Sequence, residues 1–257
     1  MGNSYTTPIL MGGGPALQSI YDVSTTALHT PGTRARMNDG REFEYVRSDN
    51  STAIGRNKLA TYDPMVAAWD KITLTTAQPV GSTQIIVPLG ATTLLANELN
   101  GGWISIDNGT GELYRIIGHA ASSGSADCTF VIDRPIVTAL TTSSVVSFNF
   151  GPCAVKISAG VTANAEAVEV AAGVPLVDIP AGNTTPQYFW VQKTGRAAVL
   201  FGTAVGGIGL AVYHGEDAGS FQVSVDTTAQ NAQVVLGTTM ALLPVDGEYH
   251  QVMLSIA

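Results

Sequence analysis

The most strongly patterned stretch of this chain is TRARMNDGREFEYVR, residues 33–47. Asn38-Asp39-Gly40 predicts a tight turn, because Asp-Gly readily adopts the positive φ angles of a two-residue hairpin loop. After the turn, the aromatic side chains at positions 43 and 45 alternate with the carboxylates at 42 and 44. A period of two is typical of a β-strand that separates its side chains onto two faces. We therefore expect a β-hairpin here, followed by a third short strand that ends near Tyr62.

Half of the cationic residues of the chain lie in this hairpin or just after it. The chain has 12 Lys and Arg residues, and the six in this region are Arg34, Arg36, Arg41, Arg47, Arg56 and Lys58. After Lys58 come six Lys and Arg and fifteen Asp and Glu residues, so the remainder has a net charge of −9. This division predicts a docking segment whose six cations contact a partner. The alternative for each single residue is a solvated face with cross-strand Arg–Glu pairs.

The composition indicates an all-β subunit. The 257 residues are only 12% charged, about half the usual fraction. Thr, Ser, Ala, Val and Gly are abundant, as expected of short strands joined by tight turns. A surface so poor in charge favours a subunit that buries surface against copies of itself or a scaffold. A monomer kept soluble by Thr and Ser is the alternative.

The predicted organisation has four parts. Residues 1–30 form an extended arm, interrupted by Gly12-Gly13-Gly14-Pro15, and residues 31–65 form the hairpin docking segment. Residues 66–152 and 153–257 form two small β-barrel or β-sandwich domains, with a junction near Gly151-Pro152. The arm becomes ordered by lying on another surface, or else it is a frayed terminus.

Two further patterns refine this expectation. Residues 103–107 and 113–117 alternate around the turn Asn108-Gly109-Thr110-Gly111, which predicts a second hairpin. Residues 188–192 and 197–201 read as two strands separated by a turn at Gly195. The best helical candidate is the brief segment from Thr92 to Leu99.

Several classes of function are disfavoured by the sequence. A net charge of −8 argues against nucleic-acid binding, which normally needs a basic face. No apolar run is long enough to span a bilayer, and the first 15 residues lack the pattern of a secretory signal. Cys128 and Cys153 predict two buried thiols, although one bridge between adjacent strands remains open.

No residue grouping predicts chemistry. His29, His119, His214 and His250 are scattered without catalytic or metal-ligating spacing. The stretch 107–112 is interpreted as a hairpin turn rather than a calcium loop. Phosphate-binding loops and a nucleophile elbow are missing. We expect no catalytic residue, metal or cofactor, and keep an all-β enzyme with scattered carboxylates as an alternative.

A family resemblance runs in order from about Gly32 to Ile256. The chain resembles phage proteins encoded beside the major capsid protein, in which a "GT" precedes "DGR-x-F-x-Y" and a small-residue "G-x-x-L" segment. The matching stretches here are 31–34, 38–47, 53–59, 101–104, 111–116 and 188–192. At Gly55–Lys58 the sequence GRNK departs from the family pattern, which usually has another alanine or glycine there.

The resemblance implies a capsid decoration, or cement, protein of a tailed bacteriophage. Such proteins bind the outside of the shell, commonly as trimers at three-fold or quasi-three-fold positions, and hold neighbouring capsomers together. It implies the major capsid protein and further copies of this chain as partners, with no nucleic acid or membrane. The location implied is the capsid exterior of the virion, after synthesis in the bacterial cytoplasm. The alternatives are a receptor- or glycan-binding module of a head or tail fibre and another structural component of the virion.

Overall fold

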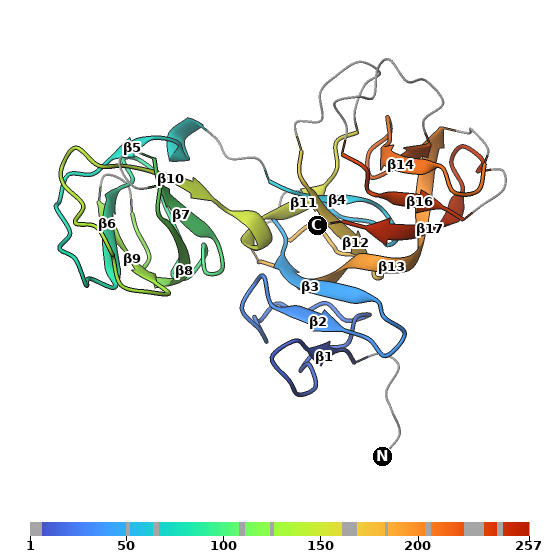
Figure 1. Ribbon diagram of the computed structural model, residues 1–257, viewed down its shortest axis with the longest axis horizontal. Coiled ribbons are helices and arrows are strands. Elements are labelled where there is room, and N and C mark those ends of the chain that lie inside the picture. The colour runs from blue at the N-terminus through green and yellow to red at the C-terminus, as the bar shows by residue number, and fades with distance from the viewer. Residues whose placement is uncertain are drawn as a thin grey trace. The chain divides into compact units, whose positions relative to one another are not determined.

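The computed structural model describes residues 7–49, 52–63, 67–107, 111–123, 126–160, 169–182, 185–203, 207–223, 234–240 and 244–256. The chain divides into two compact units, the first of which comprises Met1–Asp63 and Ala154–Ala257 and the second Pro64–Cys153. Strands dominate both units (Figure 1), and the described residues add only two short 3-10 helices, η1 (Ala67–Trp69) and η2 (Gly151–Cys153). The predicted all-β class with small barrel or sandwich parts is confirmed.

The second unit is one curved sheet with the strand order β5-β10-β7-β8-β9-β6. Its strands are β5 (Ile72–Thr73), β6 (Gln84–Pro88), β7 (Trp103–Ile106), β8 (Leu113–His119), β9 (Asp127–Ile132) and β10 (Val145–Asn149). β7 and β8 pair antiparallel, so the second predicted hairpin is confirmed, although residues 108–110 of its turn lie outside the described residues. Alternate side chains of β6, β7 and β9 are buried, and Tyr114, Phe130 and Phe148 are fully buried in the core of this unit.

Two predictions for the second unit can be compared with the structure. Cys128 and Cys153 are both buried and unbridged, as the two-thiol interpretation predicted. The helical candidate from Thr92 to Leu99 is wrong, because the chain there forms turns and a single bridge between Leu94 and Ser122. A segment this short has too few internal hydrogen bonds to hold a helix without tertiary support.

The first unit is an eleven-stranded sheet that combines both ends of the chain. Its strands are β1 (Ile9–Leu10), β2 (Arg34–Arg36), β3 (Glu42–Arg47), β4 (Ala60–Tyr62), β11 (Val155–Ile157), β12 (Ala171–Pro175), β13 (Tyr188–Thr203), β14 (Ala211–His214), β15 (Phe221–Val223), β16 (Gly237–Thr239) and β17 (Tyr249–Ser255). β1 lies at one edge, followed by β2, β3 and β13 (Figure 1). The predicted hairpin of β2 and β3 is confirmed, and its turn contains Gly40 at a φ of 86°.

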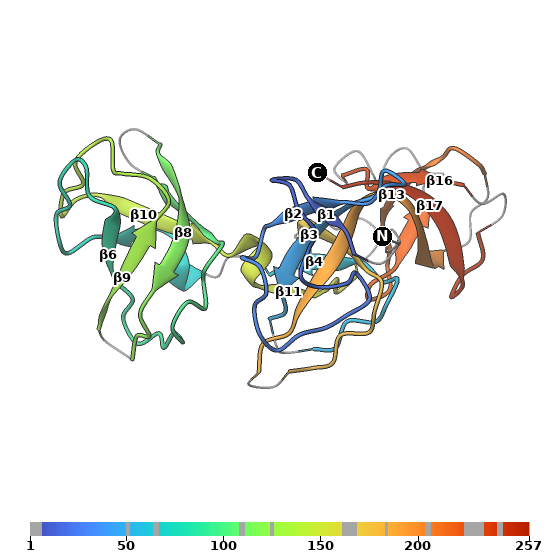
Figure 2. The same cartoon turned by 90° about the horizontal axis from the view of Figure 1, so that it is seen from below.

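Strand β13 organises the whole first unit. Its first half pairs with β3 up to Thr194, and its second half pairs with β17 from Thr194 to Leu200 (Figure 2). Gly195 therefore does not end a strand, and the predicted turn there is wrong. Instead, Gly195 has a φ of 87° inside a continuous strand that changes partners at this point. Glycine is suited to such a bend because it adopts positive φ without steric cost.

The hairpin is an internal part of the first unit, whereas the sequence pattern predicted separate parts for residues 31–65 and 153–257. Residues 31–63 share one compact unit with the chain after Ala154, because β3 pairs with β13 along six registered positions. The second unit, residues 64–153, nearly coincides with the predicted 66–152 domain. Pairing partners more than 140 residues apart cannot be recognised from local patterns, which explains the difference.

The described part of the arm is ordered on its own chain. Ser24 forms a two-way backbone bridge with Tyr188, and Gln18 accepts a hydrogen bond from Tyr45 Oη at 2.8 Å. The indole Nε1 of Trp190 donates to the Gln18 carbonyl at 3.1 Å. Ile20 is fully buried against the aromatic face of β3. The arm thus covers one side of the hairpin. On the charged side, Glu44 is buried, Arg34 and Glu42 are half-buried, and Arg36 is exposed.

Candidate docking surface

The arm holds several large apolar side chains in solvent. Five of the 17 exposed large hydrophobic side chains of the described residues fall within residues 9–28. This arm patch consists of Ile9, Met11, Leu17, Tyr21 and Leu28. The backbone between them is fixed by the contacts of Gln18 and Ser24. The backbone that carries the arm patch therefore has a defined position on the surface of the first unit.

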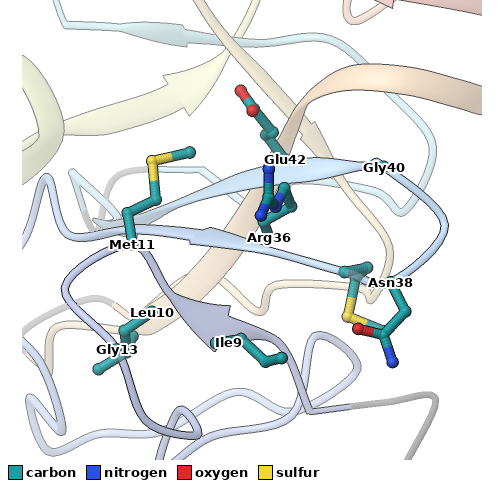
Figure 3. Close-up of a pocket in the computed structure, with 9 residues that line it drawn as sticks. Ile9, Leu10, Met11, Gly13, Arg36, Asn38, Gly40 and Glu42 are labelled. Atoms are coloured by element: carbon teal, nitrogen blue, oxygen red, sulfur yellow. The ribbon is translucent and has the colours of Figure 1, made fainter.

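A broad hollow of about 740 Å³ lies beside β1 and the hairpin turn. Figure 3 shows Met11, Arg36 and Glu42 on neighbouring segments at its wall, with Asn38 and Gly40 at the turn. Arg36 and Glu42 are registered across β2 and β3, so they project from the same face of the sheet. The hollow thus combines apolar side chains of the arm patch with one charge of each sign.

The six predicted contact cations do not form one patch. Arg36 and Arg56 are exposed, and Lys58 is half-buried with its stem against Gly55 and Gly219. Arg47 is buried at 5% exposure, so it cannot reach a partner from this fold. Arg34 and Arg41 are half-buried and occupied by ion pairs. Their carboxylate partners are Glu44 at 3.5 Å and Asp39 at 2.7 Å.

Arg34 belongs to a buried network inside the first unit. Glu44 Oε2 accepts a hydrogen bond from Tyr62 Oη at 2.8 Å and lies 3.6 Å from Lys193 Nζ. The Lys193 side chain is fully buried, and this desolvation lowers its pKa to about 8 despite the neighbouring Glu44. Burial, followed by the charge of Glu44, raises the pKa of Tyr62. This network explains why a charged residue occupies β3 at position 44.

A second, smaller hollow gathers arginines from three segments. It measures about 330 Å³ and is lined by Arg41 at the start of β3, Arg56 in the loop before β4, and Arg196 on β13. No Asp or Glu is among the residues that line it, although Arg41 pairs with Asp39 at 2.7 Å and Arg56 lies 3.9 Å from Asp178. Three of the 12 Lys and Arg residues of the chain therefore line this one hollow. We call it the arginine hollow.

The histidines of the described fold have structural environments. Nε2 of His29 accepts the backbone N–H of Leu17 at 2.9 Å, and Nε2 of His119 accepts that of Leu99 at the same distance. Burial lowers the pKa of His29 and His119, which favours the neutral rings that these acceptor roles require, and it also lowers the pKa of His214. Among the described residues, no three His, Cys, Asp or Glu side chains are placed to hold a metal ion.

Comparison with protein-family models, with curated proteins and with solved structures finds no match. Within the described residues, no helix has the length and apolarity needed to cross a membrane.

Sequence reasoning missed Arg196 and the arm patch. Arg196 is distant in sequence from Arg41 and Arg56. It lies near Arg41 only because β3 pairs with β13. The arm patch had a weak signal, the apolar run Ile9-Leu10-Met11 in an otherwise polar terminus. Nothing in the local pattern indicated which of these side chains would remain exposed.

Proposed function

We propose that this chain is a structural protein of a tailed-bacteriophage virion that binds the outside of the capsid and holds neighbouring capsomers together. The observation that carries the proposal is the arm patch, five apolar side chains held outward by a hydrogen-bonded backbone. Exposed apolar side chains on an ordered backbone suit a surface that another protein covers. The sequence resemblance supplies the identity of that protein, the major capsid protein.

The proposal includes self-association into a homotrimer. The described part of the first unit exposes Tyr249 and Met253 on β17, on the sheet face that also carries Gln251 and Arg196. Exposed Tyr, Met and Arg side chains are the types enriched where protein surfaces meet, which suits contact with further copies of the chain. Several identical contacts closed by symmetry would add avidity at the shell.

Co-sedimentation tests this function. Expanded shells of the neighbouring major capsid protein should pellet the chain saturably, whereas unexpanded procapsids should leave it in the supernatant. Equal pelleting with both, or with neither, contradicts the proposal. The fibre-module alternative predicts glycan binding instead, but Trp69 and Trp190 are buried and Trp103 is half-buried, so none of the three tryptophans offers an open stacking surface.

A further inference from the structure

We infer that the arginine hollow is a receptor for a carboxylate side chain on the protein surface to which the first unit docks. The inference rests on the proposed function, because it specifies the chemistry of the partner at one point of the interface. Arg41, Arg56 and Arg196 line about 330 Å³ in a chain whose net charge is −8. Arg41 pairs with Asp39 and Arg56 lies 3.9 Å from Asp178, so Arg196 supplies the charge that no described carboxylate compensates. A group of cations in a protein of negative net charge creates a local positive potential that attracts an anionic group.

The backbone under the hollow is fixed. Asn57 donates its N–H to the Pro175 carbonyl and accepts one from the Leu200 N–H, which holds the loop of Arg56 against β12 and β13. Arg196 is registered opposite Met253 in the pairing of β13 with β17. The backbones that carry Arg41, Arg56 and Arg196 are therefore held by sheet pairing and by these hydrogen bonds.

Gly195 explains how Arg41 reaches the hollow. A Cβ added at Gly195 would lie only 2.9 Å from Cγ of Arg41, so the absence of a side chain leaves room for the arginine stem. The guanidinium of Arg41 also lies over the Phe43 ring, 5.6 Å from its centroid, and pairs with Asp39. Arg41 is thus a fixed wall of the hollow, while Arg196 forms no ion pair with any described residue.

Gln192 holds the backbone beside Arg196. This side chain lines the hollow, is fully buried, and donates through Nε2 to the carbonyls of Thr194 and Arg196. The position of Arg196 on β13 is therefore fixed by buried hydrogen bonds.

The size of the hollow also favours a carboxylate over a nucleic acid. Nucleic-acid binding needs a basic track that neutralises several consecutive phosphates. Here the cations converge on one point, and the planar fork of arginine matches the two oxygens of a carboxylate. A single Asp or Glu side chain satisfies this geometry.

A peptide-binding experiment tests the inference without any shell. Hexaglutamate is titrated at low salt into the full chain and into the double variant Arg56→Gln/Arg196→Gln, in which both altered side chains are exposed. The control is Lys71→Gln/Arg134→Gln, which removes two exposed cations of the second unit and so changes the net charge equally. Hexaglutamate should bind the hollow variant about tenfold more weakly than the unaltered chain. The control should stay within about twofold, because its changes lie outside the hollow.

The outcomes separate this inference from the proposed function. Equal loss of hexaglutamate binding in both double variants overturns the inference, as does tighter Arg56- and Arg196-dependent binding of a single-stranded oligonucleotide or polyphosphate. If the unaltered chain pellets with expanded shells, the hollow variant should do so about tenfold more weakly; undiminished pelleting overturns the inference alone. If the unaltered chain ignores shells but still binds hexaglutamate at the hollow, the proposed function fails and the carboxylate site stands.

Discussion

The Nζ atom of Lys193 lies 3.6 Å from Oε2 of Glu44, and the side chain of Lys193 is fully buried. β3 and β13, which carry these residues, are adjacent strands at the centre of the first unit. A buried ion pair adds little net stability when intact, but removing one partner leaves the other charge uncompensated. A different register of β3 and β13 would separate Glu44 from Lys193 and leave a buried charge without its partner. The pair therefore favours the observed register.

Neutralising Glu44 should destabilise the first unit strongly. We expect Glu44→Gln to lower the free energy of unfolding by about 3–5 kcal/mol, because Lys193 is left buried without a counter-charge. Urea unfolding followed by tryptophan fluorescence measures this change. The control is Glu42→Gln on the same strand, where a half-exposed side chain should lose no more than about 0.5 kcal/mol. Equal effects of the two substitutions would show that the Lys193 pair is not structural.

The stability of the first unit should rise between pH 8 and pH 10. The folded pKa of Lys193 is about 8, below its ordinary value of 10.5, so the unfolded chain binds the extra proton across this window. Stability therefore increases as the pH rises, by on the order of 2 kcal/mol over these two units. Urea unfolding at pH 8, 9 and 10 measures the slope. Lys193→Met should flatten it, and an unchanged slope in that variant would assign the effect elsewhere.

Above pH 10 the gain should be reversed. Burial raises the pKa of Tyr45 to about 12 and also raises that of Tyr62, so the unfolded chain loses these protons first. Stability then falls as the pH rises further. A maximum near pH 10 is the signature of this combination.

A side chain at Gly195 should disrupt the partner change of β13. We expect Gly195→Ala to cost about 3 kcal/mol, since alanine must adopt a φ of 87° while its Cβ meets the Arg41 stem. Gly247→Ala is the matched control, because Gly247 has a similar φ of 75° but open space around it. That control should cost only about 1 kcal/mol in thermal or urea unfolding. Equal costs would mean that the Arg41 contact is unimportant.

The arm patch should contribute to binding without contributing to stability. Met11→Ser and Leu17→Ser remove exposed side chains, so each should change the free energy of unfolding by less than about 0.5 kcal/mol. Together they should weaken pelleting with expanded shells about tenfold, because a partner would cover these groups. Val137→Ser removes an equally exposed apolar side chain of the second unit and should leave pelleting unchanged. Normal pelleting of the double arm variant would remove the arm from the interface.

Local patterns predicted much of this fold. The alternation from Arg41 to Arg47 and the Asp39-Gly40 turn were sufficient for the β2–β3 hairpin, because both signals lie within a few residues. The same holds for β7 and β8 in the second unit. Gly195 was misinterpreted because a glycine between two apolar runs has the same appearance in a turn as in a bent strand.

The candidate site was only partly predictable, for the same reason. Arg41 and Arg56 belonged to the predicted cationic segment, whereas Arg196 reaches them only because β13 pairs with β3. Arg47 was a candidate contact, yet its side chain is buried in the first unit. Charge density along a sequence does not distinguish an exposed cation from one that lies in the interior. Only the tertiary structure shows which cations are exposed.

Shell rupture provides the most direct test of the central claim that this chain fastens capsomers. Expanded shells, with and without saturating amounts of the chain, are heated while release of their contents is followed by dye fluorescence. A protein that binds only the assembled lattice must stabilise it by mass action, so the rupture temperature should rise with occupancy and level off at saturation. Shells that bind the chain but rupture at an unchanged temperature would contradict the claim.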